Sequence, residues 1–388
     1  MGENILIVHG GGPTAVINAS LYGAVTEAKK HRELEHIYAA KNGTGGLLRE
    51  EFIELSKIPQ EELELLLQTP GSAIGTSRDQ LEQEEYDRMA DILQKRNIRY
   101  VLFNGGNGTM DTCGKLYRTC KGKGFDVCVM GIPKTMDNDI AITDHSPGFG
   151  SAARYIAQSV KEVCADVRGL PIHVVVIEAS GRNAGWITAA SALADDGDGN
   201  GPDLIYLPER PFDEDKYIED VERLLKRKSG IVVVASEGLR DADGKPIVPP
   251  IFQVGRATYF GDVSAHLANL VIRRLGYKAR GEKPGLLGRA SMMLQSEVDR
   301  DEAVLAGRLA CAKVLKGTSG KMVAFRRVSV KPYEMEPFLV DIDEVMMHER
   351  TMPDTYINEE GNGVTEAFKE WCRPLIGGEL PRMTAFNQ

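Results

Sequence analysis

The chain has 388 residues, which is more than a single hydrophobic core usually accommodates, so two domains are expected. Hydrophobic residues make up 42% of it and charged residues 27%, a balance that excludes a disordered or fibrous chain. The 47 Lys and Arg are outnumbered by 56 Asp and Glu, and the net charge is −9. A broad basic surface, and with it a nucleic-acid partner, is therefore not expected.

Along the chain, short runs rich in Val and Ile alternate with longer amphipathic segments, which is typical of strands and crossover helices in a parallel sheet. The clearest strands are predicted at residues 5–8, 100–103, 127–130, 174–177 and 231–234. Helices are predicted at residues 61–68, 86–96, 109–121, 152–166, 216–226, 260–275 and 302–315. This alternation indicates the α/β class, in which ligands bind beyond the carboxyl ends of the strands.

Two features of the sequence indicate a cytoplasmic protein without membrane contact. The first predicted strand runs directly into glycines, so no signal peptide is expected, and no apolar run reaches the roughly 18 residues of a membrane span. The six cysteines form no C-x-x-C pair and no set with His at metal-ligand spacing. Free thiols in a reducing compartment are the simplest interpretation.

Two glycine-rich turns follow predicted strands and open predicted helices. The first reads Gly-Gly-Gly-Pro-Thr-Ala-Val-Ile-Asn at residues 10–18, and the second reads Phe-Asn-Gly-Gly-Asn-Gly-Thr at residues 103–109. Glycines let backbone amides approach a phosphate, and a helix N-terminus adds partial positive charge. Either turn alone is also compatible with a tight connection that binds no ligand. Two such turns in one sheet favour a two-sided phosphate cradle.

A third segment, Gly131–Asp139, reads Gly-Ile-Pro-Lys-Thr-Met-Asp-Asn-Asp and follows the predicted strand at 127–130. Its last six residues contain a cation, a hydroxyl and two carboxylates. Phosphoryl transfer to an alcohol needs a base near the hydroxyl, neutralisation of the moving charge and usually a divalent metal. The segment therefore predicts a phosphoryl-transfer site, although Asp and Asn after Pro also cap turns.

Arginines on turns that follow strands form the fourth signal. Ser-Gly-Arg at residues 180–182 and Ser-Glu-Gly at residues 236–238 each follow a predicted strand, and Arg280 and Arg289 flank a Gly-rich stretch further on. Surface arginines are usually solvated charge. Arginines at strand ends, however, suit bidentate capture of a sugar phosphate.

In this order and spacing, the segments resemble the phosphofructokinase family over most of the chain. The resemblance implies two Rossmann-like three-layer α/β domains with mostly parallel sheets. The phosphoryl-donor domain would comprise residues 1–145 and 290–340, and the sugar-phosphate domain residues 146–289 and 341–388. The implied reaction is transfer of a phosphoryl group to the 1-hydroxyl of fructose 6-phosphate, and a homo-oligomer, dimer or tetramer, is expected.

The resemblance also implies a role for individual residues. Asp137 matches the base that deprotonates the sugar hydroxyl, Thr135 contacts the same end of the sugar, and Asp139 lies near a Mg²⁺ ion. Asn107 stands where many members have a metal-binding Asp, so Mg²⁺ is expected to depend more on Asp139. Arg182 matches a residue that stabilises the transferring phosphoryl. The expected sugar-phosphate contacts are Ser180, Gly181, Arg182, Glu237 and, as a clamp on the 6-phosphate, Arg280 and Arg289; the expected donor contacts are Gly12, Arg78, Gly106, Asn107, Gly108, Thr109 and Lys134.

Two residues point to different donors. Gly108 stands where an Asp fills the space for the α-phosphate of ATP in pyrophosphate users, so glycine permits ATP, whereas Lys134 is typical of pyrophosphate-dependent members. A cation attracts either donor, so the resemblance favours ATP, with pyrophosphate as the alternative. Three further departures, Thr44 for an adenine-stacking aromatic, His173 for an Arg and Leu286 for a His, leave base recognition and the 6-phosphate site open.

Other interpretations remain at this point. A non-catalytic sugar-phosphate-binding regulator on the same scaffold is disfavoured because Thr135, Asp137, Asp139 and Arg182 are all present. A dehydrogenase is disfavoured because the dinucleotide-binding spacing of glycines is absent. A related acceptor such as sedoheptulose 7-phosphate stays open.

Overall fold

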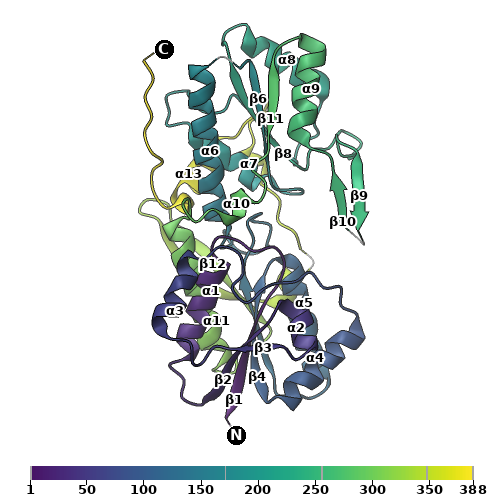
Figure 1. Ribbon diagram of the computed structural model, residues 1–388, viewed down its shortest axis with the longest axis vertical. Coiled ribbons are helices and arrows are strands. Elements are labelled where there is room, and N and C mark those ends of the chain that lie inside the picture. The colour runs from purple at the N-terminus through teal and green to yellow at the C-terminus, as the bar shows by residue number, and fades with distance from the viewer. Residues whose placement is uncertain (1, 171, 255–256, 347, 387–388) are drawn as a thin grey trace. The chain divides into compact units, whose positions relative to one another are not determined.

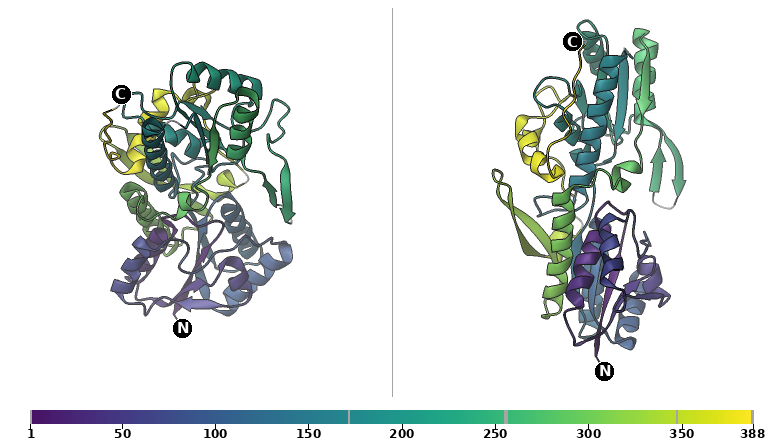
Figure 2. Two further views of the ribbon diagram at one scale, coloured as in Figure 1. Left: turned by 45° about the horizontal axis from the view of Figure 1, so that its top comes forward. Right: turned by 60° about the vertical axis from the view of Figure 1, so that its left-hand side comes forward.

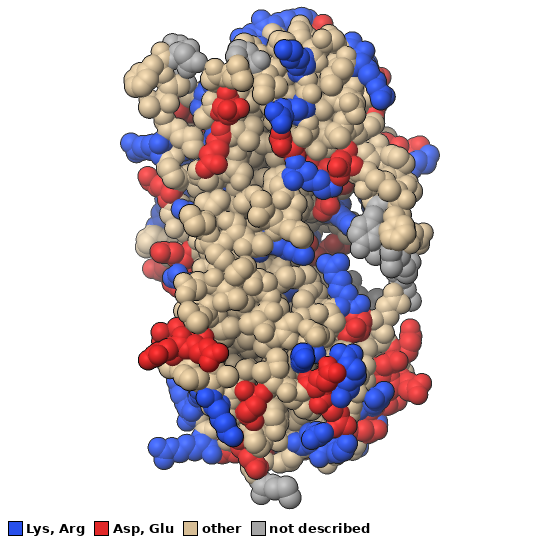
Figure 3. Space-filling model, viewed as in Figure 1, with Lys and Arg blue, Asp and Glu red and all other residues tan. Residues whose placement is uncertain are grey.

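The computed structural model describes residues 2–170, 172–254, 257–346 and 348–386. None of the helices in this part of the chain has the length and apolar character that crossing a bilayer requires. On the face drawn in Figure 3, Lys and Arg of the described residues are interspersed with Asp and Glu, and no continuous basic field is visible there. The lack of a basic field on this face agrees with the excess of acidic residues, which gives the net charge of −9.

The chain forms two compact units, each made of two separate stretches of sequence. Unit 1 comprises Met1–Ser151 and Arg289–Arg350, and unit 2 comprises Ala152–Gly288 and Thr351–Gln388. The expected domain limits need correction at three places, because residues 146–151, Arg289 and residues 341–350 lie in unit 1 and not in the second domain.

Hydrogen bonds explain the corrections at residues 146–151 and 341–350. The backbone amides of Gly148 and Ser151 donate to the buried Asp299 carboxylate of unit 1 at 2.8 and 2.9 Å. At the second place, Nη1 of Arg350 donates to the carbonyl oxygen of Thr143 at 2.7 Å. These contacts hold both segments to unit 1.

Unit 1 is built around a seven-stranded sheet in the order β13-β12-β5-β4-β1-β2-β3. The strand pairs within β12-β5-β4-β1-β2 are parallel, and both edge pairs, β12 with β13 and β2 with β3, are antiparallel. The strands are β1 (Glu3–His9), β2 (Leu34–Ala40), β3 (Phe52–Glu54), β4 (Ile98–Gly105), β5 (Cys128–Pro133), β12 (Lys321–Ser329) and β13 (Glu334–Asp341).

Helices cover both faces of this sheet (Figures 1 and 2). Ile5 and Ile7 of β1 belong to the core that includes α1 (Ile17–Ala28) and α11 (Glu297–Val314). The alternate residues Leu6 and Val8 belong to the core that includes α4 and α5, as the two-residue period of a strand requires. The remaining helical segments of unit 1 are α2 (Gly43–Leu48), α3 (Gln60–Glu64), η1 (Leu65–Gln68), α4 (Gln83–Lys95), α5 (Asn107–Gly122) and α12 (Ile342–Val345).

Unit 2 contains a four-stranded, all-parallel sheet in the order β11-β6-β8-β7 and a separate antiparallel hairpin, β9-β10. Helix α8 begins where Asp213 accepts hydrogen bonds from the amides of Asp215 and Lys216, an N-cap that satisfies free helix-start donors. The strands are β6 (Val174–Ala179), β7 (Leu204–Tyr206), β8 (Ile231–Ser236), β9 (Pro250–Val254), β10 (Ala257–Phe260) and β11 (Ala279–Glu282); the helices are α7 (Trp186–Ala190), α8 (Glu214–Leu225), α9 (Val263–Leu275) and α13 (Glu366–Cys372).

Two helices cross the boundary between the units along the chain. Helix α6 (Phe149–Gly169) begins in unit 1 and continues in unit 2, and the short α10 (Leu287–Ala290) returns to unit 1. The α/β class and all five predicted strands are confirmed. Several helix starts were wrong by three to five residues. Helix α11 begins at Glu297 and not at 302, and α9 begins at Val263 and not at 260, because Phe260 pairs with Pro250 in the hairpin.

Candidate active site

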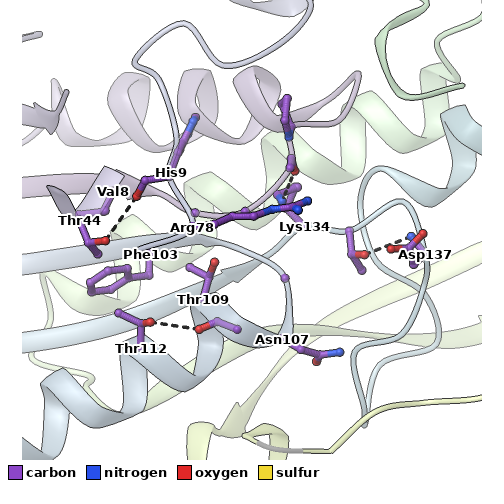
Figure 4. A pocket seen from close by; sticks show the side chains of 18 of the residues that line it. Val8, His9, Thr44, Arg78, Phe103, Asn107, Thr109, Thr112, Lys134 and Asp137 are labelled. Carbon is purple, nitrogen blue, oxygen red and sulfur yellow. Dashed lines mark hydrogen bonds between the residues drawn. The ribbon is translucent and has the colours of Figure 1, made fainter. Parts of the chain in front are cut away.

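Three loops at the carboxyl ends of β1, β4 and β5 surround one pocket of about 420 Å³ in unit 1 (Figure 4). The strands are neighbours and parallel, so their carboxyl ends lie at the same edge of the sheet. Every residue that lines the pocket belongs to unit 1. The pocket is therefore complete within this unit.

Thr109 packs closely against the loop after β1 and against the end of β4. A Cβ at Gly10 would lie 2.3 Å from Thr109 Oγ1, and a Cβ at Gly105 would lie 2.2 Å from the same atom. Both positions therefore require glycine. Helix α5 starts at Asn107, directly after β4, so its first amides face the pocket end of the sheet.

Gly108, in the first turn of α5, borders open space. An added Cβ there would meet no atom within 4 Å, so the glycine leaves room beside the pocket. The sequence predicted this open space. A side chain would therefore fit at position 108.

Three cations meet at the first loop. A Cβ at Gly12 would lie 2.7 Å from Nη1 of Arg289 and 3.2 Å from Nη2 of Arg78, and a Cβ at Gly11 would lie 3.6 Å from Nζ of Lys134. We call these three side chains the cation cluster. They approach the backbone this closely because neither glycine carries a side chain, and together they make the first loop strongly attractive to an anion.

Lys134 is the most buried member of the cation cluster, with 3% of it exposed. Its Nζ donates to the carbonyl oxygen of Gly12 at 2.5 Å, and its own amide donates to the carbonyl of Gly105 at 3.0 Å. Burial lowers the pKa of Lys134 to about 8, against the charge of Asp137, so the ammonium remains mostly protonated at neutral pH. Lys134 thus joins all three loops.

Asp137 is half-buried and lines the same pocket. Its amide donates to Oγ1 of Thr135 at 3.1 Å, which fixes the carboxylate-bearing turn to the buried Thr135. The next residue, Asn138, has a φ of 54° in the left-handed region, and its Oδ1 accepts the amide of Ser146 at 3.0 Å. The side-chain bond favours this uncommon backbone conformation and holds Asp137 in place.

Asp139 and Asn107 form a polar pair at the edge of the pocket. Nδ2 of Asn107 donates to Oδ2 of Asp139 at 2.9 Å and to its carbonyl oxygen at 3.0 Å. Oδ1 of each residue is buried and accepts no hydrogen bond from the described residues. Burial raises the pKa of Asp139.

These two unpaired oxygens fit a partial ligand set for Mg²⁺, which commonly binds through one or two protein oxygens and the phosphates of the substrate. A complete protein set of three or more His, Cys, Asp or Glu is not found among the described residues.

Unit 2 brings four of the predicted sugar-phosphate residues together. Ser180, Gly181 and Arg182 follow β6, and Glu237 follows the neighbouring β8. The Gly181 amide donates to Oε1 of Glu237 at 3.2 Å, and Ser236 Oγ donates to the Gly181 carbonyl at 2.6 Å. The two turns therefore form one connected surface at the strand ends.

The two clamp arginines are not brought together within either unit. Arg280 lies on β11 beside Val175, near the start of β6, and its Nε pairs with Glu282 at 2.7 Å. Arg289 belongs to unit 1 and to the cation cluster. A joint clamp on a 6-phosphate therefore stays a prediction, while Arg289 lies in the pocket that holds the predicted donor residues.

Four polar residues of the pocket were not predicted from the sequence, namely His9, Ser77, Asp79 and Thr112; Thr44, expected at the position that recognises a base, also lines the pocket. His9 is buried, its Nδ1 lies 2.8 Å from Ser72 Oγ, and burial, with Lys134 nearby, lowers its pKa to about 3, so the ring is neutral at pH 7. The sequence signal for His9 was its position directly before the glycines at residues 10–12. Asp79 directly follows the predicted Arg78, but the partners of its carboxylate lie far away in the sequence.

Comparison with known proteins agrees with this site. The fold and the anion pocket define an α/β phosphotransferase, and residues 4–313 match the family model described as Phosphofructokinase. The chain belongs to the phosphofructokinase family.

Two relatives and one solved structure show its place in the family. The chain is 39% identical to the pyrophosphate–fructose 6-phosphate 1-phosphotransferase of Xanthomonas campestris, covering 97% of this chain and 92% of that protein. It is 34% identical to the sulfofructose kinase of Alkalicoccus urumqiensis, covering 99% and 98%. The crystal structure of a pyrophosphate-dependent phosphofructokinase from Marinobacter aquaeolei superimposes with a TM-score of 0.89 at 34% identity, covering 99% and 94%. These names do not support the expected preference for ATP, and the alternative donor fits them better.

Proposed function

We propose that the protein transfers a phosphoryl group from pyrophosphate to the 1-hydroxyl of fructose 6-phosphate. The observation that carries this proposal is the cation cluster beside Asp137. Three cations at glycines 11 and 12 neutralise a compact polyanion, and a carboxylate in the same pocket accepts a proton. The names of the similar proteins support pyrophosphate over ATP.

Each group of the pocket has a part in the proposed mechanism. Asp137 accepts the proton of the attacking hydroxyl, and Thr135 holds the turn that carries it. Lys134, Arg78 and Arg289 stabilise the negative charge on the donor as the phosphoryl moves. The open space beside Gly108 does not require ATP, because it also accommodates water around a smaller donor.

Mg²⁺ would be held by Oδ1 of Asn107 and Oδ1 of Asp139 together with the donor. Bound there, it would offset part of the charge on the donor phosphates. In unit 2 we propose that Arg182 and Glu237 bind the sugar phosphate.

The proposal is tested by measuring kcat/KM of the purified protein with fructose 6-phosphate and Mg²⁺, once with pyrophosphate and once with ATP. We expect pyrophosphate to exceed ATP by about a hundredfold, which corresponds to about 2.7 kcal/mol of transition-state stabilisation. Sulfofructose is the matched alternative acceptor, because a relative is named for it. A higher kcat/KM with ATP would refute the donor, and a higher kcat/KM with sulfofructose would refute the acceptor.

A further inference from the structure

One wall of the pocket carries a fixed negative charge. Oδ2 of Asp79 accepts three hydrogen bonds, from Thr44 Oγ1 at 2.6 Å, Ser77 Oγ at 2.6 Å and the amide of Gly45 at 2.7 Å. Oδ1 accepts none from the described residues, so it keeps its full capacity as an acceptor at this wall. We call Thr44, Ser77 and Asp79 the acidic wall.

The backbone fixes the acidic wall in place. Asn42, the N-cap of α2, and Gly43, its first residue, have φ values of 60° and 72°, and a Cβ at Gly43 would lie 2.2 Å from Ser77 Oγ. The start of α2 is thus packed against Ser77. Although burial opposes it, the hydrogen bonds from Ser77 and Thr44 lower the pKa of Asp79, with a further contribution from Arg49, so the carboxylate is ionised at neutral pH.

The pocket therefore has opposite charges on different parts of its lining. In Figure 4, Asp137 and Thr44 lie at opposite sides of the drawn pocket, with Arg78 and Lys134 between them. A donor whose reacting phosphoryl lies near Asp137 would occupy the cation cluster with its first two phosphates. A third phosphate would then extend toward the acidic wall. There the hydroxyls of Thr44 and Ser77 already donate to Asp79, so they are not free to bind a phosphate.

We propose that Asp79 is a specificity-determining residue that limits the phosphoryl donor to two phosphates by repelling a third. This inference rests on the proposed pyrophosphate donor. Arg49 partly offsets the charge, and Asp79 remains exposed to solvent, so the effect is moderate. We expect the charge of Asp79 to lower the ratio of kcat/KM with ATP to kcat/KM with pyrophosphate by about tenfold.

Inorganic tripolyphosphate tests the idea in the unaltered protein, because it adds a third phosphate without a nucleoside. A site governed by the cation cluster alone would bind this more highly charged ion more tightly than pyrophosphate. We expect its inhibition constant against pyrophosphate to exceed the KM of pyrophosphate by about tenfold, at constant free Mg²⁺. Equal or tighter binding of tripolyphosphate would overturn the inference without any variant.

The variant Asp79→Asn removes the charge and keeps the size of the side chain. We expect the ratio of kcat/KM with ATP to kcat/KM with pyrophosphate to rise about tenfold, and tripolyphosphate to inhibit more strongly. Asp91→Asn is the matched control, because Asp91 pairs with Lys123 at 2.6 Å and does not line the pocket. The control should leave the ratio within twofold of its original value.

Different outcomes separate the two proposals. If the unaltered protein uses ATP better than pyrophosphate, the proposed function fails. If it prefers pyrophosphate but Asp79→Asn leaves the ratio unchanged, only the role of Asp79 fails. A lower ratio would show that the carboxylate binds the nucleotide, for example through its ribose hydroxyls, and would also overturn the inference.

Discussion

At the scale of single residues, the site depends on glycines, which leave space for neighbouring groups, as much as on charged side chains. Gly11 and Gly12 let the cation cluster approach the backbone, and a Cβ at Gly12 would lie 2.7 Å from Nη1 of Arg289. A substitution at Gly12 would displace the guanidinium groups and reduce the attraction for an anion. Gly11 also has a φ of 76°, which favours glycine for its backbone conformation.

Asp137 is the residue whose chemistry is most directly testable. We expect Asp137→Asn to leave the KM values nearly unchanged and to reduce kcat by roughly 10²- to 10⁴-fold, because an amide cannot accept the hydroxyl proton. Steady-state kinetics of the purified variant measure this loss. Asp87→Asn, on the surface helix α4, is the control. Turnover close to that of the unaltered protein would remove Asp137 from the mechanism.

Arg289 and Arg280 are expected to affect different substrates. Arg289→Ala should raise the KM for pyrophosphate, because the side chain contacts the glycine loop of the donor pocket, with a loss of about 1.5–3 kcal/mol. Arg280→Ala, in unit 2, should act on the KM for fructose 6-phosphate and leave that for pyrophosphate unchanged. If Arg289→Ala changes only the KM for the sugar phosphate, Arg289 binds the 6-phosphate as the sequence predicted.

Many of the residues that sequence reasoning found lie in short motifs directly after strands, where the residue types themselves indicate a site. Lys134, Thr135 and Asp137 stand within four positions and line one pocket. Thr44 and Asp79 are 35 positions apart, and only the packing of α2 brings them together. A contact of this kind leaves no local pattern, so the sequence alone did not reveal it.

At the scale of elements, the segment that carries Asp137 is a closed loop. The amide of Thr135 donates to the carbonyl of Pro147 at 3.1 Å, and the amide of Ser146 donates to Oδ1 of Asn138 at 3.0 Å. These bonds join the beginning of the loop to its end. The position of the Asp137 carboxylate therefore depends on what holds residues 144–148.

A buried charge cluster lies at the end of this loop. His145 is 2% exposed; its Nε2 lies 2.5 Å from Oε2 of Glu302 and its Nδ1 lies 2.9 Å from Oδ2 of Asp144. Arg327 pairs with Asp144 at 2.9 Å, and the Tyr333 hydroxyl donates to Glu302 at 2.6 Å. Burial alone would lower the pKa of His145, but the charge of Glu302 and the bond with Asp144 outweigh it and raise the pKa to about 9.

This shift predicts a pH dependence of stability. The folded pKa of His145 is above its unfolded value of 6.5, so its contribution is complete below pH 6.5 and disappears as the pH rises through about 9. We expect His145→Gln to reduce the free energy of unfolding by a few kcal/mol at pH 6.5, because it leaves buried carboxylates without their cation. The difference from the unaltered protein should shrink toward pH 10 in urea unfolding.

A second buried group changes stability in a lower range of pH. Burial raises the pKa of Asp299 to about 6. Its contribution to the free energy of unfolding is therefore complete below about pH 4 and is lost as the pH rises through about 6, a range that does not overlap with that of His145. His31→Gln, which replaces a histidine paired with the exposed Glu33 outside this cluster, is the matched control for the substitution itself. A difference for His145→Gln that stays constant from pH 6.5 to 10 would contradict the raised pKa.

The elements that sequence patterns predicted are the buried ones. The strands at 5–8, 100–103 and 231–234 are continuous apolar runs, because both faces of a parallel sheet are covered. Strand β13 was missed because it lies at the antiparallel edge of the sheet and its apolar run, residues 338–340, is only three residues long. Strand β7 has three residues, too few for a recognisable pattern.

At the scale of the whole molecule, each unit is assembled from two distant stretches of sequence. Strands β12 and β13 and helix α11 come from the second stretch of unit 1, and α11 packs on the same face of the sheet as α1 (Figure 2). A discontinuous division was expected only through the family resemblance. Hydrophobic patterns along the chain identify elements, but they do not show which distant elements share a core.

The binding roles of the two units are tested by hydrogen exchange measured in segments along the chain. Pyrophosphate with Mg²⁺ should slow exchange at least threefold at residues 10–16 and 105–110, because these loops line the pocket in unit 1. Fructose 6-phosphate should slow exchange at residues 179–183 and 236–239, where the turns after β6 and β8 are joined by hydrogen bonds. Sulfate at equal concentration is the control for general anion binding.

Each ligand should also leave hydrogen exchange at the predicted binding residues of the other unit without direct protection. The cation cluster lies wholly in unit 1, so the proposed pyrophosphate donor would have its charged partners there and would need none of the predicted unit 2 residues. Protection of 179–183 by pyrophosphate alone, without protection of 10–16, would contradict the assignment of the donor to unit 1. Equal protection by sulfate and pyrophosphate would show that the cation cluster attracts anions without selecting the donor.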